Sequence, residues 1–284
     1  MKMSAQEFLD WESKSITLLA MSGAGKTTLA NKLPKKKWFH YSADYRIGTQ
    51  YLEEPILDNI KQQAMDVPFL QDLLLTDSIY ICNNITVDNL APVSSFLGKI
   101  GNPELGGLSL QEFKRRQRLH RSAEIAAMKD VPAFIHKAED IYDYKHFIND
   151  AGGSVCELDD SDTLAILAEH TLIVYIKIPE NLEQTIIDRA KSDPKPLYYR
   201  EEFLDQKLDE YLRLKGLGHT DAISPDDFVS WVFPELFKSR LPRYQAIVDQ
   251  YGYTIDASEA GEIVDEDDFI QLIAKSIDQQ ELSN

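Results

Sequence analysis

A short segment near the N-terminus combines glycines, a lysine and a threonine at a spacing suited to holding phosphate. Residues 20–28 read Ala-Met-Ser-Gly-Ala-Gly-Lys-Thr-Thr. Gly23 and Gly25 permit backbone conformations closed to other residues, so that successive N–H groups can converge on phosphate oxygens. Lys26 adds a positive charge for the same oxygens, and the Thr27 hydroxyl is a suitable ligand for Mg²⁺. The segment therefore predicts binding of a nucleotide through its phosphates, with ATP and Mg²⁺ as the expected cofactors.

The segments on either side of this loop are those that a phosphate-binding loop requires. The pattern matches the Walker A motif, Gly-x-x-x-x-Gly-Lys-Ser/Thr, with Ala20 in place of the first glycine. The apolar run 16–20 predicts a buried parallel strand, and 28–33 predicts a helix whose free N–H groups and dipole favour phosphate. A surface turn that carries a lysine by chance would not combine strand, loop and helix in this order. The predicted nucleotide-binding residues are Ser22, Gly23, Ala24, Gly25, Lys26, Thr27 and Thr28.

Carboxylates follow two other apolar segments. Residues 38–41, Trp-Phe-His-Tyr, predict a second strand, after which comes Asp44. Ligands of open α/β sheets bind at the carboxyl ends of strands, so Asp44 is placed to orient an acceptor hydroxyl, take its proton or support Mg²⁺. The alternative is that Asp44 only stabilises a turn or caps a helix. Asp159 could likewise end a magnesium-binding strand, but a helix cap at Asp160 or Ser161 is the favoured interpretation of that segment.

Strand and helix patterns alternate along much of the chain, and strands separated by helices predict an α/β fold with a three-layer parallel sheet of the P-loop NTPase class. The further predicted strands and amphipathic helices lie at 146–153 up to a glycine turn, 171–178, 180–190, 253–256 and 265–277. The predicted core comprises residues 1–50 and 146–284, including a lid at about 189–245. Residues 51–145 are mostly helical in pattern, with one candidate strand at 78–82, and are predicted to be a substrate-binding insertion.

The order of these motifs resembles that of shikimate kinase and related small-molecule P-loop kinases, a nucleoside and shikimate kinase-like fold. About half of the chain takes part, and residues 51–145 and about 205–235 have no counterpart. The segments that carry the resemblance are the Walker A loop, Ser42-x-Asp44-x-x-Ile47, Gly152-Gly153, the strand around Val174, Arg189, Lys195-Pro196-Leu197, Arg240-x-Pro242-x-Tyr244 and Tyr253 to Asp256.

The resemblance implies roles for particular residues of this chain. Arg189 is implied to stack on adenine, and Arg240 to grip an anionic group of the acceptor. The implied catalytic residues are Lys26, Asp44, Lys195 and Arg240. The implied substrate-binding residues are Asp44, Arg46, Gly152, Gly153 and Arg240, and the implied metal-binding residues are Thr27 and Asp44.

Three positions depart from the family pattern. Ser42 stands where the family has an aspartate, Ser154 where it has a third glycine, and Lys195 where it has an arginine. A lysine presents a point charge instead of a rigid fork of donors. We therefore expect the acceptor to be a small anionic hydroxyl compound other than shikimate.

The predicted activity is Mg²⁺-dependent transfer of the γ-phosphoryl group of ATP to a hydroxyl of a small metabolite. Catalysis would consist chiefly of positioning and charge stabilisation, with lid cations closing over the phosphate. One alternative is an ATPase or GTPase that acts as a switch on a protein partner, although the guanine-specifying Asn-Lys-x-Asp pattern is missing. Another is a nucleotide or polynucleotide kinase that uses the basic run 114–121. That run predicts either an anion-binding face in the substrate-binding insertion or a solvated helix paired with Glu112 and Glu124.

Composition sets limits on partners and location. The 284 residues include 30 Lys and Arg and 47 Asp and Glu, a formal charge of −17, which opposes binding to nucleic acid or to an anionic membrane. No apolar run reaches the roughly 20 residues that span a bilayer, and the first 15 residues lack a signal-peptide pattern. Two cysteines make no disulfide framework, so a reducing cytoplasm is expected. Nothing in the sequence indicates an oligomeric state.

Overall fold

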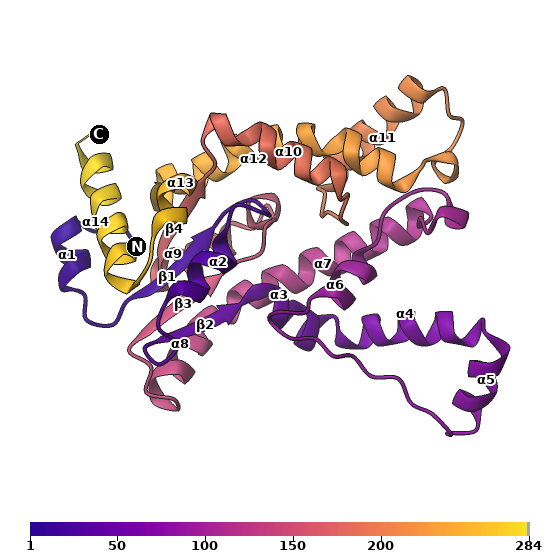
Figure 1. Ribbon diagram of the computed structural model, residues 1–284, viewed down its shortest axis with the longest axis horizontal. Helices are drawn as coiled ribbons and strands as arrows, with labels where there is room; N and C mark the ends of the chain where they lie inside the picture. Colours follow the sequence, from indigo (N-terminus) through magenta and orange to yellow (C-terminus); the bar gives the residue numbers. More distant parts are fainter. Residues whose placement is uncertain (283–284) are drawn as a thin grey trace. The chain divides into compact units, whose positions relative to one another are not determined.

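The computed structural model describes residues 1–282 and divides into two compact units. The first unit comprises Met1–Ala43, Ile125–Pro194 and Ser230–Asn284, and it holds the sheet. The second unit comprises Asp44–Glu124 and Lys195–Val229 and is built mainly from helices. Figure 1 shows the elements of each unit, coloured along the chain.

Five short strands form one parallel sheet in the first unit. They are β1 (Ser15–Leu19), β2 (Trp38–Ser42), β3 (His146–Asp150), β4 (Leu172–Lys177) and β5 (Gly252–Asp256). Their order across the sheet is β2-β3-β1-β4-β5, so β1 lies in the centre between β3 and β4. Every residue of β1 is buried, as expected for a parallel strand covered on both faces.

Helices cover one face of this sheet through a continuous apolar core. The helices that pack there are α1 (Ala5–Asp10), α2 (Lys26–Lys32), α13 (Ala257–Glu262) and α14 (Glu266–Glu281). Their Phe8, Leu29 and Phe269 side chains are buried with Leu18 and Val174 of the central strands. Leu18 and Val174 lie on this face because alternate residues of a strand point to opposite sides.

The opposite face of the sheet is covered by a second set of helices. They are α8 (Val131–Asp140), α9 (Ser161–His170) and the part of α12 (Pro225–Tyr251) from Ser230 onward, and α10 (Glu180–Ser192) follows β4. The ring of Tyr41 packs edge-on against Phe134 at 4.9 Å, and Tyr175 stacks on Tyr244 at 4.9 Å. Figure 1 shows the sheet between these helices and those of the other face. The predicted three-layer parallel α/β fold is thus confirmed.

The strand order reverses direction beside β1. The chain passes from β1 to β2 on one side of the sheet and later from β3 across β1 to β4 on the other side. Where the connections from two adjacent strands, here β1 and β3, run in opposite directions, a crevice opens at the carboxyl ends of the strands, and α/β proteins bind ligands in such crevices. The loop that follows β1 lies at this point.

A buried polar cluster joins α14 to the amino-terminal ends of the strands, at the edge of the sheet away from the loop that follows β1. Glu266 accepts hydrogen bonds from Trp38 Nε1 at 2.8 Å and from Lys37 Nζ at 2.6 Å. Burial alone would raise the pKa of Glu266, but these donors outweigh it and lower the pKa. The neighbouring His146 is buried and accepts a hydrogen bond at Nδ1 from the backbone N–H of Lys14 at 3.1 Å. Burial lowers the pKa of His146 from 6.5 to about 4.

This cluster predicts a loss of stability in mild acid. The folded chain holds the His146 proton less tightly than the unfolded chain, so its contribution is complete above pH 6.5 and is lost as the pH falls towards 4. We expect His146 to lower the free energy of unfolding by about 1–2 kcal/mol between pH 7 and pH 5. Urea unfolding of His146→Gln should show a flatter pH dependence, whereas the exposed control His136→Gln should behave as wild type. Equal pH dependence in all three chains would contradict this assignment.

The second unit contains the basic run that the sequence singles out. Its helices are α3 (Ala43–Arg46), the π-helical turn η1 (Ile47–Tyr51), α4 (Glu53–Met65), α5 (Pro68–Leu75), α6 (Ala91–Leu97), the short turns η2 (Pro103–Leu105) and η4 (Thr220–Ala222), and α11 (Glu201–Lys215), with most of α7 (Leu110–Lys129) and the start of α12. Arg115 and Arg116 of α7 both bind Glu112, and Lys114 binds Asp205 of α11 at 2.6 Å. The run is thus paired with acids of its own unit, including the predicted partner Glu112.

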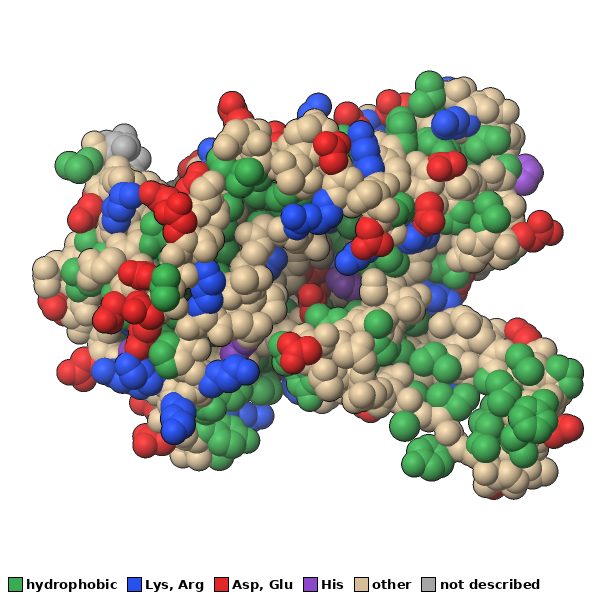
Figure 2. All heavy atoms as spheres, viewed as in Figure 1, with side chains coloured by type: hydrophobic (Ala, Val, Ile, Leu, Met, Phe, Trp, Pro, Cys, Tyr) green, Lys and Arg blue, Asp and Glu red, His purple; other side chains and the backbone are tan. Residues whose placement is uncertain are grey.

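An apolar surface lies over α5 in the second unit. In α5, all of whose residues the structure describes, no side chain is buried, although six of its eight residues are apolar or proline. Phe69 is 71% exposed and Leu75 is 70% exposed, and Tyr80, which follows the helix, is also exposed. Figure 2 shows hydrophobic side chains gathered over this part of the chain. An exposed apolar surface of this kind is typical of an interaction site.

One expectation about local structure is wrong, and one of two alternatives is excluded. The segment 78–82 contains no strand, although all of its residues are described. The segment before Asp159 is the 3₁₀ turn η3 (Val155–Glu157), so Asp159 does not end a strand. Asp160 instead caps α9 by accepting a hydrogen bond from the N–H of Thr163, which confirms the favoured interpretation. No helix within residues 1–282 is both long and apolar enough to cross a bilayer.

Candidate functional site

The phosphate-binding loop lies at the carboxyl end of the central strand. It occupies residues 20–25, and α2 begins at Lys26. Gly23 and Gly25 have φ angles of 86° and 93°, in the left-handed region that other residues enter only with strain. Apart from the chain neighbours of each glycine, none of the described residues comes within 4 Å of the place where a Cβ atom would stand on Gly23 or Gly25. The loop therefore has the backbone conformation and the open space that a row of phosphates needs.

The side chain of Lys26 is folded back onto this loop. It is only 8% exposed, and its Nζ atom donates a hydrogen bond to the carbonyl oxygen of Ala20 at 2.9 Å. Ser22, Thr27 and Thr28 are exposed on the same loop and first helical turn. A phosphate on the loop would offer the ammonium group a charged acceptor, which makes a stronger hydrogen bond than a carbonyl does.

A carboxylate on the strand next to β1 completes the site. Asp150 is the last residue of β3 and lies opposite Leu18 of β1 in the sheet. Its Oδ2 atom accepts a hydrogen bond from the hydroxyl of Thr27 at 2.5 Å. His40 of β2 approaches the same oxygen, with its Nε2 atom 3.7 Å away. Asp150 is itself buried, so its carboxyl group is held beside the loop at the carboxyl end of the sheet.

The pair formed by Thr27 and Asp150 has the chemistry of a magnesium site. Mg²⁺ prefers oxygen ligands and is held in nucleotide-binding proteins by one or two protein groups together with phosphate oxygens. In P-loop enzymes these groups are the hydroxyl after the conserved lysine and an aspartate at the end of a neighbouring strand. Among residues 1–282 no three His, Cys, Asp or Glu side chains could hold a metal ion. The residues present therefore fit an ion that arrives with a nucleotide.

A second layer of contacts supports the loop from behind. A Cβ atom on Gly153 would lie 3.2 Å from the backbone nitrogen of Ser22, so the glycine allows the two segments to approach closely. The carbonyl oxygen of Gly153 accepts hydrogen bonds from Arg240 Nη1 at 3.1 Å and from the Tyr244 hydroxyl at 3.0 Å. Arg240 is 4% exposed, and its Nε atom lies 3.5 Å from the buried carboxylate of Glu157. Arg240 is thus held against Glu157 and Gly153 within the first unit.

The other predicted site residues are divided between the two units. Gly152 is buried beside Gly153 in the first unit, and Arg189 is exposed in the last turn of α10 in the same unit. Asp44, Arg46 and Lys195 belong to the second unit. Asp44 lies in the first turn of α3, two residues after the end of β2, so it comes after a strand as predicted. The roles given to these residues in binding adenine and the acceptor stay predictions.

The segment that contains Lys195 is fixed within the second unit by a glutamine of α7. The Nε2 atom of Gln117 donates a hydrogen bond to the carbonyl oxygen of Leu197 at 3.2 Å, and its Oε1 atom accepts one from the N–H of Tyr199 at 2.8 Å. The ring of His120 stacks on Tyr198 at 5.7 Å. One face of the basic helix therefore holds the backbone that follows Lys195.

The structure brings together the predicted nucleotide-binding loop and adds one carboxylate to it. Asp150 is absent from the residues predicted from the sequence, which placed the second candidate carboxylate at Asp159. A signal for it exists, since apolar Phe147 and Ile148 precede Asp150 at the end of a strand. The pairing of β3 with β1 that brings Asp150 to Thr27 is a long-range contact, which the local pattern does not reveal.

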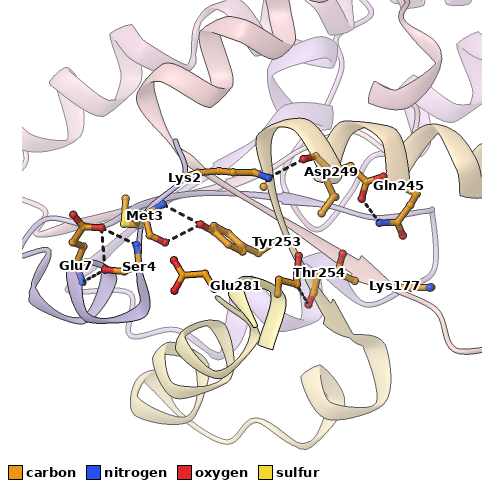
Figure 3. A pocket seen from close by; sticks show the side chains of 13 residues that line it. Lys2, Met3, Ser4, Glu7, Lys177, Gln245, Asp249, Tyr253, Thr254 and Glu281 are labelled. Atoms are coloured by element: carbon orange, nitrogen blue, oxygen red, sulfur yellow. Dashed lines mark hydrogen bonds between the residues drawn. The ribbon is translucent and has the colours of Figure 1, made fainter. Parts of the chain in front are cut away.

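A cavity of about 710 Å³ lies elsewhere, beside the edge strand β5. Figure 3 shows the side chains that line it, including Lys2, Glu7, Asp249 and Tyr253. Its polar groups bind one another: the hydroxyl of Tyr253 donates to Met3 O and accepts from Met3 N, and Lys2 donates to Asp249 O. The charges of the lining are mixed, and the cavity does not contain the phosphate loop. The loop therefore stays the candidate functional site.

Comparisons with known proteins find similarity only among solved structures. No family model matches the chain, and no curated protein matches it. The similar structures include shikimate kinase from Bacteroides thetaiotaomicron, 15% identical with a TM-score of 0.37, which covers 95% of this chain and 98% of that one. They also include shikimate kinase from Acinetobacter baumannii in complex with shikimate, 14% identical with a TM-score of 0.33, which covers 82% of this chain and 99% of that one. Similarity this distant says nothing about activity or substrate.

Proposed function

We propose that this chain is a kinase that binds Mg²⁺ and ATP at the loop 20–25 and phosphorylates a hydroxyl of a small anionic metabolite. The observation that carries the proposal is the contact between Thr27 and Asp150 beside an open glycine loop. A hydroxyl and a carboxylate at this place form the protein part of a magnesium–nucleotide site.

The loop and its neighbours would hold the nucleotide. The N–H groups around Gly23 and Gly25 cradle the phosphates, and Lys26 turns from Ala20 to the phosphate oxygens. Thr27 and Asp150 supply protein ligands to Mg²⁺, directly or through water. Bound Mg²⁺ would neutralise charge on the phosphate oxygens.

The residues that the sequence assigns to the acceptor have separate proposed roles. Asp44 orients the acceptor hydroxyl and takes its proton as a bond forms between that oxygen and the γ-phosphorus, while the bond to the β-phosphate breaks and ADP leaves. Arg240 and Lys195 provide positive charge for anionic groups. In this proposal Arg240 keeps its contacts, with its Nε atom 3.5 Å from the buried Glu157 carboxylate, and acts on the acceptor through its charge. We also propose a reducing cytoplasm as the setting, since two cysteines in 284 residues make no disulfide framework.

The test is transfer of label from [γ-³²P]ATP to a pool of cellular metabolites. We expect Mg²⁺-dependent formation of a labelled phosphate ester by the wild-type chain. Asp44→Asn should reduce this transfer by roughly 100-fold or more and leave the affinity for Mg·ATP within about twofold, because the acceptor loses its base while the loop is unchanged. Asp66→Asn, a substitution of an exposed acid in the same unit, serves as the control. Loss of nucleotide binding by Asp44→Asn would show that the acceptor role is wrong.

A second candidate function is an ATPase that acts on a protein partner. The observation that favours it is the exposed apolar surface of α5, which includes Phe69 and Leu75. The same label distinguishes the two activities. A kinase leaves the label in an ester whose amount follows the acceptor, whereas an ATPase releases it as inorganic phosphate whatever metabolite is present.

A further inference from the structure

A junction of hydrogen bonds joins α12 to the phosphate loop. The carbonyl oxygen of Ala20 accepts from Lys26 Nζ at 2.9 Å and from the Tyr244 hydroxyl at 3.1 Å. The carbonyl oxygen of Gly153 accepts from Arg240 Nη1 at 3.1 Å and from the same hydroxyl at 3.0 Å. Tyr244 is fully buried, so its hydroxyl lies between two carbonyl groups that each have a second donor.

The hydroxyl of Tyr244 has one proton for these two acceptors. It can therefore make one strong hydrogen bond at a time, although its oxygen lies within reach of both carbonyls. In the structure both acceptors are supplied, since Lys26 serves Ala20 and Arg240 serves Gly153. The Tyr244 hydroxyl can thus donate its hydrogen bond to whichever of the two carbonyls loses its other donor.

Only one of the two charged donors is expected to leave. Arg240 is held by the buried carboxylate of Glu157, 3.5 Å from its Nε atom, and this fixes its other end against Gly153. Lys26, in contrast, has to release Ala20 in order to reach a phosphate. Ala20 is buried. If its carbonyl lost every hydrogen-bond donor, the free energy of the nucleotide-bound state would rise.

We propose that Tyr244 is a positioning residue that takes over the carbonyl of Ala20 when Lys26 turns to a bound phosphate. The hydroxyl turns its proton from Gly153 to Ala20, and Arg240 continues to serve Gly153. Release of Lys26 then leaves neither carbonyl without a donor, so that the nucleotide binds more tightly. This inference rests on the proposed function for the affinity that it predicts, but the exchange of donors can also be tested without any ligand.

The first experiment measures the affinity for Mg·ATP and for magnesium tripolyphosphate by calorimetry. Tyr244→Phe removes the hydroxyl and keeps the ring. It should weaken the binding of both ligands by roughly 5- to 30-fold. The matched control is Tyr175→Phe, since Tyr175 is buried and stacked on Tyr244 at 4.9 Å. The control should bind both ligands within about twofold of wild type, because none of its described hydrogen bonds reaches Ala20 or Gly153.

The second experiment is a double-mutant cycle on the unliganded chain. Lys26→Met removes the ammonium group from Ala20, so Tyr244 becomes the donor that remains. Tyr244→Phe should then lower the melting temperature more in the Lys26→Met chain than in the wild-type chain. Equal effects in the two backgrounds would mean that the hydroxyl does not replace Lys26, and would overturn the inference.

The outcomes separate this inference from the proposed function. If wild type binds Mg·ATP and Tyr244→Phe binds it within twofold, or if Tyr175→Phe weakens binding equally, the inference is wrong and the nucleotide site stands. If wild type binds neither ligand, the proposed function is wrong and the predicted effect on affinity is wrong with it. Weaker binding by Tyr244→Phe alone, together with coupling in the cycle, supports the inference.

Discussion

Lys26→Ala is expected to weaken the binding of Mg·ATP by roughly 100-fold or more and to abolish turnover. Loss of one partner from a buried, charge-assisted contact costs several kcal/mol of binding free energy. No other lysine lies within residues 20–28 to replace Lys26. The effect on folding should be smaller, because the hydroxyl of Tyr244 can still donate to Ala20, which Lys26 serves in the unliganded chain. Calorimetry with Mg·ATP and a thermal melt of the same sample measure both quantities.

The matched control for this variant lies on the same helix. Lys32 ends α2 and binds the backbone carbonyls of Gly261 and Ile263, away from the loop. Lys32→Ala should lower the melting temperature and leave the affinity for Mg·ATP within about twofold. Retained affinity in Lys26→Ala, or an equal loss in Lys32→Ala, would contradict the assignment of the loop.

Asp150→Asn is expected to reduce Mg²⁺-dependent turnover by roughly 100-fold or more. The amide keeps the shape of the side chain and can still accept from Thr27, but it lacks the negative charge that attracts Mg²⁺. Binding of ATP in the presence of a chelator should change little, because the loop and Lys26 are untouched. Titration of turnover with Mg²⁺, and of ATP binding with and without the ion, separates these two effects.

A second aspartate provides the control for Asp150. Asp159, which the sequence offers as an alternative carboxylate for magnesium, binds Arg243 at 2.8 Å on the surface instead. Asp159→Asn should leave the Mg²⁺ dependence as in wild type. A large effect at Asp159 together with none at Asp150 would restore the alternative and remove the role of β3.

Local patterns were sufficient for the loop and for the fold class. The apolar run before Ala20, the two glycines, Lys26 and Thr27 each follow from short-range chemistry, and the structure has the expected strand, loop and helix. The strands β2 to β5 are likewise apolar segments set between helices. These features depend on neighbours in the sequence, which the pattern of residue types records.

Features that depend on contacts between distant parts of the chain were harder to predict from the sequence. Asp150 becomes part of the site only because β3 pairs with β1, and the sequence does not state which strands are neighbours. Arg240 lies in a motif that predicts contact with an anionic group. Its burial against Glu157, however, depends on a turn more than 80 residues earlier in the chain. The exchange inferred for Tyr244 needs the positions of three separate segments.

The basic run 114–121 shows the same limit. As a helix rich in Lys and Arg it predicts either an anion-binding face or a solvated face. The structure adds that Lys114 and Arg118 bind acids of α11, that Arg116 is buried against Phe96, and that Gln117 holds the backbone after Lys195. The choice between these interpretations depends on ion-pair partners almost 100 residues away in the chain. The local charge pattern does not identify those partners.

The central claim is most directly tested by a crystal structure of the chain grown with Mg²⁺ and a non-hydrolysable ATP analogue. We predict that the phosphates lie on the N–H groups of residues 22–28, that Lys26 Nζ has left Ala20 for a phosphate oxygen, and that Mg²⁺ lies at Thr27 beside Asp150. An analogue bound elsewhere, such as in the cavity beside β5, or phosphates that do not touch the loop, would contradict the account.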